Sequence, residues 1–273
     1  MASKLALLLC LALPLPASAA KKLLEHPYWK SAVPAAKAPP SEAWMTPGET
    51  LQYKIYWGMI PVGTSYLRVE RAVDVSSRTA WHLISEADSN SFIGNFYPVA
   101  DRNESWIDTS DLDSLGYYRK ISEGRYFFNE WAVFDRAAGR FYGEEMNRKG
   151  KVSPFEGKLD APVPVSDYLS AVYRLRATKL SPGDVAQVDV MSRKPFRLTV
   201  KARKFQKIAT PYGTRKCLLL EPMEGGNGLF VSKSGKRMYV WVTDDELRLP
   251  MMLKAEIFIG SVTAKLVKRT ITP

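Results

Sequence analysis

The sequence predicts a mainly β protein, an antiparallel β-barrel or strongly curved half-barrel with one amphipathic helix. From Thr50 onward, short runs rich in β-branched and aromatic residues recur with Gly, Pro, Asp and Ser between them. A spacing of about 8–12 residues between such runs is typical of antiparallel sandwiches and barrels. Only the segment 166–179 has apolar residues at helical spacing. We therefore expect one helix to pack across the opening of a curved sheet.

The N-terminus has the three parts of a secretory signal peptide. Lys4 precedes an apolar run from Leu5 to Leu15, and small residues follow up to Ala19. The run is shorter than the roughly 20 residues that span a bilayer. A lipid-anchored Cys10 is disfavoured because Leu9, rather than a small residue, precedes it. We expect cleavage after Ala19 and export to the periplasm or cell envelope, without a membrane-spanning segment.

The segment 20–46 is rich in Pro, Ala and Lys and lacks a hydrophobic period, which indicates a linker or arm. Tyr28, Trp29 and Trp44 are candidate anchors of this arm onto the domain that follows. We interpret residues 47–273 as a single β-rich domain. Its lone cysteine, Cys217, lies in an apolar run and is expected to be a small buried side chain.

Lysine and arginine outnumber aspartate and glutamate by 39 to 28, which gives a formal net charge of +11. Such an excess favours acidic partners such as anionic lipid head groups or acidic glycans, or it serves solubility alone. Export argues against nucleic acid.

Alternation of apolar and polar residues identifies the first strand at 51–57. Gly260 is expected to form a tight hairpin at 259–262. In the helical segment, Ser166 is the expected N-cap, and Tyr168, Leu169, Val172 and Leu175 form the apolar stripe. Further strands are expected at 66–70, 80–87, 102–108, 115–121, 126–134, 141–146, 185–190, 196–201, 205–208, 216–220, 238–242, 251–258 and 262–267.

The sequence contains few residues suited to catalysis. Its two histidines, His26 and His82, stand alone, and no cluster has the spacing of metal ligands. Neither a nucleophile elbow nor a phosphate-binding loop is present. We therefore predict no catalytic residue, no metal and no cofactor, and Asp244-Asp245-Glu246 is interpreted as a charged turn.

Arg102, Glu104 and Trp106 share one strand face with Asp108, because side chains alternate along a strand. If that face points inward, the charges need each other or a ligand; if it points outward, they form ordinary ion pairs. Together with Trp57 and Tyr97 as walls, Arg102, Glu104 and Trp106 are the candidate ligand-binding residues. The many aromatic side chains either fill the barrel or line a pocket for one small ligand.

Several segments resemble the exported bacterial family known as domain of unknown function 3108. They are Trp57–Thr64, Phe96–Asp108, Asp167–Ala171, Trp241–Pro250 and Ile259–Ala264, in the family's order. The family usually has a proline after the helix-opening aspartate, where this chain has Tyr168. The resemblance implies an envelope protein with a β-rich, barrel-like fold, and it implies no activity or site residue.

The leading functional hypothesis is a non-enzymatic envelope protein that holds an apolar or amphipathic ligand, such as a lipid or lipid-linked glycan, inside the curved sheet. One alternative is a scaffold that docks an envelope protein partner through the arm or through the loop 222–237. The other is a glycan hydrolase, which would need two carboxylates about 5–9 Å apart across a cleft, with Glu104, Asp101 and Asp244 as the obvious candidates.

Overall fold

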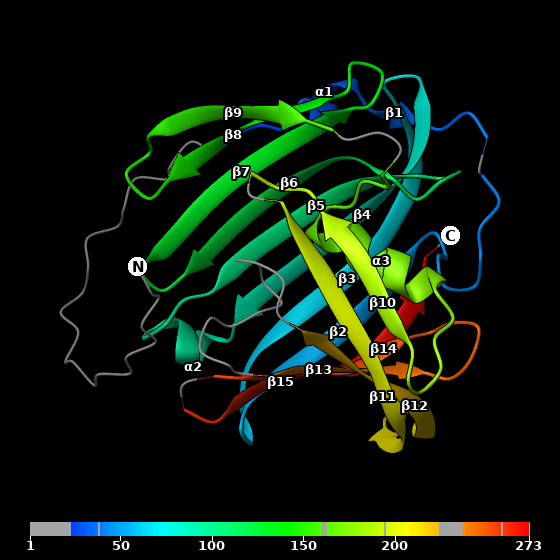
Figure 1. Ribbon diagram of the computed structural model, residues 1–273. Helices are drawn as coiled ribbons and strands as arrows, with labels where there is room; N and C mark the ends of the chain where they lie inside the picture. Colours follow the sequence, from blue (N-terminus) through cyan, green and yellow to red (C-terminus); the bar gives the residue numbers. More distant parts are fainter. Residues whose placement is uncertain are drawn as a thin grey trace.

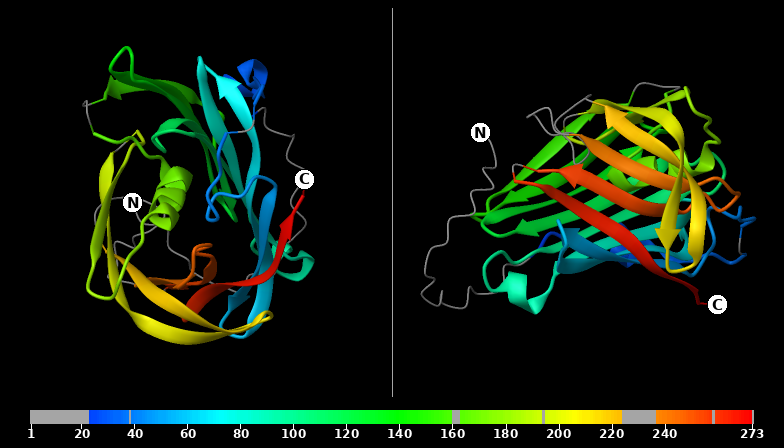
Figure 2. Two further views of the ribbon diagram at one scale, coloured as in Figure 1. Left: turned by 90° about the vertical axis from the view of Figure 1, so that its right-hand side faces the viewer. Right: turned by 90° about the horizontal axis from the view of Figure 1, so that it is seen from below.

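One long antiparallel sheet forms most of the molecule. The computed structural model describes residues 23–37, 39–159, 163–193, 195–223, 237–257 and 259–272. The sheet curls into a barrel-like shape in which β15 pairs with β2, and its two edges are β9 and β10 (Figures 1 and 2). The predicted signal peptide and most of the loop 222–237 lie outside the described residues.

The strands follow one another in the sheet almost in chain order, β10 through β15 and then β2 through β9, with the short β1 beside β3. Their bounds are β1 Val33–Pro34, β2 Glu49–Trp57, β3 Ile60–Val75, β4 Arg78–Ser89, β5 Ala100–Asp108, β6 Ser114–Glu123, β7 Tyr126–Asp135, β8 Arg140–Asn147, β9 Val152–Lys158, β10 Val185–Val190, β11 Phe196–Thr210, β12 Gly213–Met223, β13 Met238–Thr243, β14 Pro250–Glu256 and β15 Ser261–Ile271. The helices are α1 Tyr28–Ser31, α2 Ser91–Gly94 and α3 Tyr168–Ala177.

This architecture confirms the predicted fold class, with differences in detail. The runs 196–201 and 205–208 form one strand, β11, because a bulge between Ala202 and Phe205 restores the pairing with β12. Strand β9 was not predicted, since Pro154 and Gly157 interrupt an exposed, weakly apolar segment. The short helices α1 and α2 were not predicted either. Cys217 is buried and free, as expected.

The helix α3 lies inside the curl of the sheet (Figure 2). Asp167, rather than the expected Ser166, is its N-cap: Oδ1 of Asp167 accepts hydrogen bonds from the backbone N–H groups of Leu169 and Ser170. A carboxylate at this position complements the positive end of the helix. Leu169 and Tyr173 then pack in one buried cluster with Leu51 and other inward-facing side chains. The helix thus supplies part of the barrel's core.

The carboxylate of Asp167 also ties the helix to the sheet. Its Oδ2 atom accepts hydrogen bonds from the hydroxyls of Ser105 on β5, at 2.5 Å, and Ser114 on β6, at 2.6 Å. The group is 1% exposed, and burial raises its pKa. Four hydrogen bonds therefore offset the cost of removing this side chain from water.

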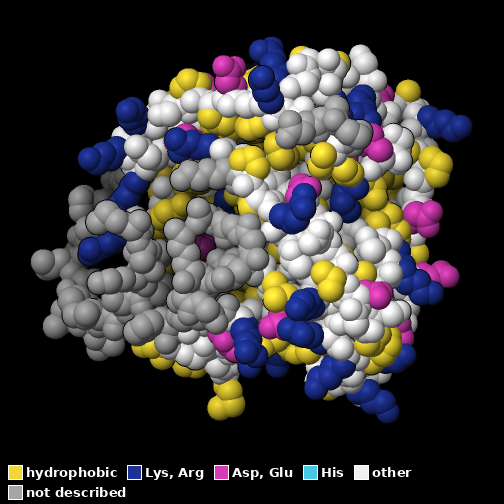
Figure 3. All heavy atoms as spheres, in the orientation of Figure 1, with side chains coloured by type: hydrophobic (Ala, Val, Ile, Leu, Met, Phe, Trp, Pro, Cys, Tyr) yellow, Lys and Arg dark blue, Asp and Glu magenta, His cyan; other side chains and the backbone are white. Residues whose placement is uncertain are grey.

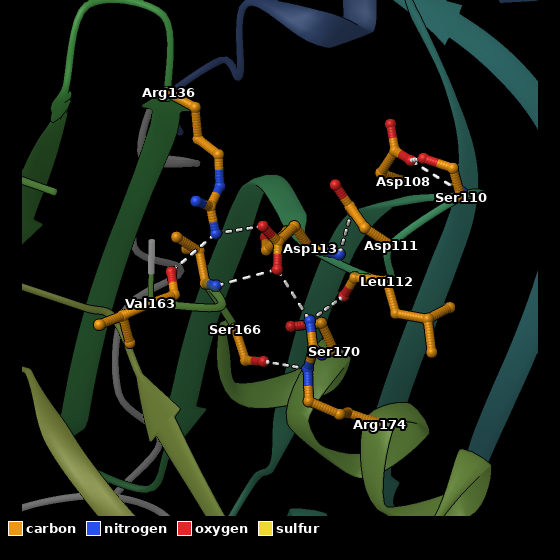
Figure 4. A network of polar contacts seen from close by, with 12 residues as sticks. Asp108, Ser110, Asp111, Leu112, Asp113, Arg136, Val163, Ser166, Ser170 and Arg174 are labelled. Carbon is orange, nitrogen blue, oxygen red and sulfur yellow. Dashed lines mark hydrogen bonds and ion pairs between the residues drawn. The ribbon is translucent and has the colours of Figure 1, made fainter. Parts of the chain in front are cut away.

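The seam between the edge strands β9 and β10 is bridged by the segment that leads into α3. The N–H of Ser114 donates to the carbonyl of Val165 on one side, and the N–H of Met191 donates to the carbonyl of Ser166 on the other. Asp113 binds three groups around this segment (Figure 4). Its carboxylate pairs with Arg136 after β7 and with Arg174 of α3, and it accepts a hydrogen bond from the N–H of Val165. The sheet thus stays open, and one crossing segment with the side chains around it links β6 to the end of β10.

A buried ion cluster fixes the other end of α3. Arg176 pairs with Glu49 at 2.9 Å, and the second oxygen of Glu49 accepts from Arg269 at 2.8 Å. None of the helices in the described ranges is long and apolar enough to cross a membrane.

Replacing Asp167 by alanine removes the helix cap and leaves two buried serine hydroxyls unpaired. We expect Asp167→Ala to lower the free energy of unfolding by about 3 kcal/mol, from a lost cap and unsatisfied hydroxyls. Urea unfolding measures this value. Asp184→Ala, which removes an exposed turn carboxylate bonded to Ser181 N–H, is the control and should cost less than about 1 kcal/mol. Equal losses in both variants would contradict the role assigned to Asp167.

Candidate functional site

Three of the predicted site residues lie together on the outer face of the sheet. On β5, Ser105 points inward to the helix, so Arg102, Glu104 and Trp106 point outward. Arg102 Nε is 2.7 Å from Glu104 Oε1, so these two charges pair with each other. The opposite oxygen of Glu104 contacts His82 Nε2 at 2.8 Å and accepts from Trp29 Nε1 at 3.0 Å.

Burial acts to raise the pKa of Glu104, but the hydrogen bonds from His82, Trp29 and Arg102 outweigh it and lower that pKa to about 2. The carboxylate is therefore charged and fully engaged at neutral pH. A general acid would need a raised pKa, so this environment does not suit Glu104 for that role.

The arm covers this cluster. His26 stacks on Trp106 with ring centroids 4.4 Å apart, and His82 stacks on the same indole at 4.8 Å. Tyr28 meets Trp106 edge-on at 5.4 Å, and Leu24 belongs to the same buried cluster. The segment predicted as an arm thus covers Glu104 and Trp106, whereas the side chain of Arg102 stays 37% exposed.

Trp57 and Tyr97 lie elsewhere. Trp57 ends β2 and donates its indole N–H to the carbonyl of Ile259 in the β14–β15 turn. The ring of Tyr97 lies against Gly124 in the β6–β7 turn. The structure therefore brings three of the five candidates together and separates two, and a ligand-binding role for them stays a prediction.

The acidic residues considered for glycan hydrolysis lie in three different environments. Asp101 accepts from the N–H of Ser122, and burial raises its pKa to about 7. Glu104 lies on the outer face beneath the arm, and Asp244 pairs with Lys216 at 2.6 Å. They share no partner and form no facing pair. Among the residues with described positions, no group of three or more His, Cys, Asp or Glu side chains could hold a metal ion.

A cavity of about 510 Å³ lies beside the C-terminal end of α3. It is a half-open hollow bordered by that end of the helix, β12, the β13–β14 turn and the segment around Trp44. Its apolar lining comprises Ala43, Trp44, Leu175, Leu180, Leu218, Leu220 and Val242, and its polar lining comprises Glu42, Thr178, Lys179, Thr243, Asp244, Asp245, Glu246 and Arg248. None of the five predicted site residues lines it.

Sequence reasoning missed this cavity because its walls come from four distant segments. The only local signal was the acidic run 244–246, interpreted as a charged turn. Two of its carboxylates are engaged, since Asp244 pairs with Lys216 and Asp245 accepts from the hydroxyl of Thr243 and the N–H of Arg248. These contacts hold the turn where it lines the cavity.

Comparison with known proteins identifies a family and distant structural neighbours. Residues 52–267 match the family model DUF3108, a protein of unknown function. A beta-barrel-like protein of domain of unknown function DUF1849 from Brucella abortus has 10% identity and a TM-score of 0.49, with 82% of this chain and 97% of that chain covered. A predicted lipoprotein from Parabacteroides distasonis has 10% identity and a TM-score of 0.36, with 84% and 98% covered. No curated protein is significantly similar to the chain.

Docking of the arm should depend on pH through His26. This side chain is fully buried; its Nδ1 accepts from the N–H of Tyr28, so its Nε2 carries the proton and donates to the carbonyl of Ala132. Burial lowers the pKa of His26 from 6.5 to about 4. The folded state thus disfavours the charged ring. The contribution of neutral His26 to the free energy of unfolding is fully present above pH 6.5 and decreases as the pH falls toward 4.

We expect this effect to cost about 3 kcal/mol when the pH has fallen to about 4, because one pKa unit corresponds to about 1.4 kcal/mol. Urea unfolding from pH 7 to pH 4 measures it, with the variant His26→Phe as reference. The variant should show a smaller loss of stability over this range. Parallel pH profiles for the two proteins would show that His26 does not titrate as inferred.

Proposed function

The chain belongs to the DUF3108 family, and we propose that this member is a non-enzymatic envelope protein that binds an amphipathic molecule in the cavity beside α3. The observation that carries the proposal is the cavity itself. Its volume of about 510 Å³ is within the range of about 300–1,000 Å³ that small-molecule sites occupy.

The lining suits a ligand with an apolar part and a polar end. Leucine and valine side chains from α3, β12 and β13 supply the apolar part of the lining. The polar lining holds four carboxylates and two cations, Lys179 and Arg248. A head group that carries an amine or several hydroxyls complements this excess of negative charge. An acyl chain or other lipid part would lie against the apolar part of the lining.

The envelope location rests on the sequence. The pattern of Lys4, the apolar run 5–15 and the small residues before Ala20 supports export. A lipid or lipid-linked glycan is available there as a ligand. The absence of recognisable catalytic spacing in the sequence supports binding rather than turnover.

Filling the cavity should abolish binding. We expect Leu180→Trp to weaken the binding of N-phenyl-1-naphthylamine, a fluorescent apolar probe, at least about tenfold, because the indole would occupy the space of the ligand. Fluorescence titration measures the dissociation constant. Val185→Trp, on the exposed side of β10 and away from the cavity, adds the same side chain and should leave binding unchanged.

Native mass spectrometry of the protein purified from an envelope fraction identifies the natural ligand. A stoichiometric adduct that Leu180→Trp lacks would support the proposal. Equal adducts in the wild type and Leu180→Trp would place the ligand outside this cavity.

A further inference from the structure

The barrel end opposite the cavity carries exposed hydrophobic side chains on three neighbouring turns. Met59 and Ile60 lie at the β2–β3 turn, Phe92 and Phe96 at α2 and just after it, and Ile259 at the β14–β15 turn. Met59 is 93% exposed, Phe96 72% and Phe92 67%. We call these five residues the apolar rim. Figure 2 shows that α2 and the two turns lie at one end of the barrel.

The turns of the apolar rim are fixed to one another. Asn90 caps α2, and its side-chain amide donates to the carbonyl of Pro61 at 2.7 Å, which joins α2 to β3. The N–H of Gly58 donates to the carbonyl of Ser261 at 3.0 Å, and Trp57 donates to Ile259 at 2.9 Å. The exposed side chains are therefore held outward by a hydrogen-bonded support.

Exposed apolar side chains of this size, grouped on adjacent turns, mark an interaction surface. Hydrophobic side chains project at the lower rim of the molecule below α2 (Figure 3). A projecting surface of this kind suits insertion into a lipid bilayer, which adapts to its shape, whereas a folded protein partner would need a groove of matching shape. Phe92 and Phe96, whose rings meet edge-on at 5.9 Å, add an aromatic surface of the kind that interfacial segments insert between lipid head groups.

Basic residues lie on two further turns at the same end of the barrel. Arg125 is exposed in the β6–β7 turn, and Lys149 and Lys151 are exposed in the β8–β9 turn. The whole chain has a net charge of +11. Cationic side chains beside apolar ones favour contact with anionic head groups.

We propose that the apolar rim inserts into the interfacial region of a phospholipid bilayer that contains anionic lipid. The barrel stands on the membrane by this end, with the cavity at the far end. This inference does not depend on the proposed function, because no rim residue lines the cavity.

Sedimentation with vesicles tests the proposal. The protein as purified from cells should sediment with vesicles of phosphatidylethanolamine and phosphatidylglycerol. We expect the variant Met59→Ser/Phe92→Ser/Phe96→Ser to bind at least about tenfold more weakly, because three apolar side chains no longer enter the bilayer. The control variant Val33→Ser/Val185→Ser/Ile271→Ser removes three side chains that are 50–56% exposed away from the rim, and it should bind like the wild type.

A second variant tests the electrostatic part. Arg125→Gln/Lys149→Gln/Lys151→Gln should weaken binding to the anionic vesicles about tenfold or more and lose most of its salt dependence. Equal vesicle binding by the wild type and the rim variant would overturn the proposal. Sedimentation velocity tests whether the apolar rim instead binds a second copy of this chain. If the wild type were a dimer, the rim variant a monomer, and neither bound vesicles, the membrane proposal would be wrong and the rim would be a dimer interface.

Discussion

The hydrogen bonds of Asp167 hold the one long helix of the described structure inside the sheet. The sheet does not close on itself by strand pairing, because β9 and β10 remain edges. A curved sheet with two free edges needs side chains packed against its concave face and contacts that link the regions near its two edges. The segment that begins α3 provides both, since its backbone contacts β6 on one side and β10 on the other, and its capping carboxylate binds Ser105 and Ser114. Asp113 and its two arginines reinforce the same junction.

The two ends of the barrel differ because the helix does not run its whole length. Its C-terminal end is pinned by Arg176 and Glu49, and the cavity opens beside that end. The opposite end has projecting turns instead. One end thus has a half-open hollow with acidic residues in its lining, and the other end has an apolar surface with basic residues on neighbouring turns.

Period-two alternation was enough to predict most strands and the fold class, because an antiparallel strand with one buried face leaves a local trace in the sequence. Strand β9 leaves little such trace, because its half-buried face, Ser153, Phe155 and Gly157, has only one large apolar side chain. The cluster of Arg102, Glu104 and Trp106 followed from alternation as well, but which face points outward did not. That choice depends on the arm, whose His26 and Trp29 come from a segment without any period. The cavity could not be predicted, since its walls are joined only by the folded topology.

The buried position of the arm imposes an order on folding. His26 and Tyr28 rest on side chains and carbonyls supplied by β5, β6 and β7, between Trp106 and Ala132. The surface that receives the arm exists only after those strands have paired. The arm is synthesised before these strands and is therefore among the last parts to reach its place; until then its histidine and aromatic side chains remain open to chaperones and proteases.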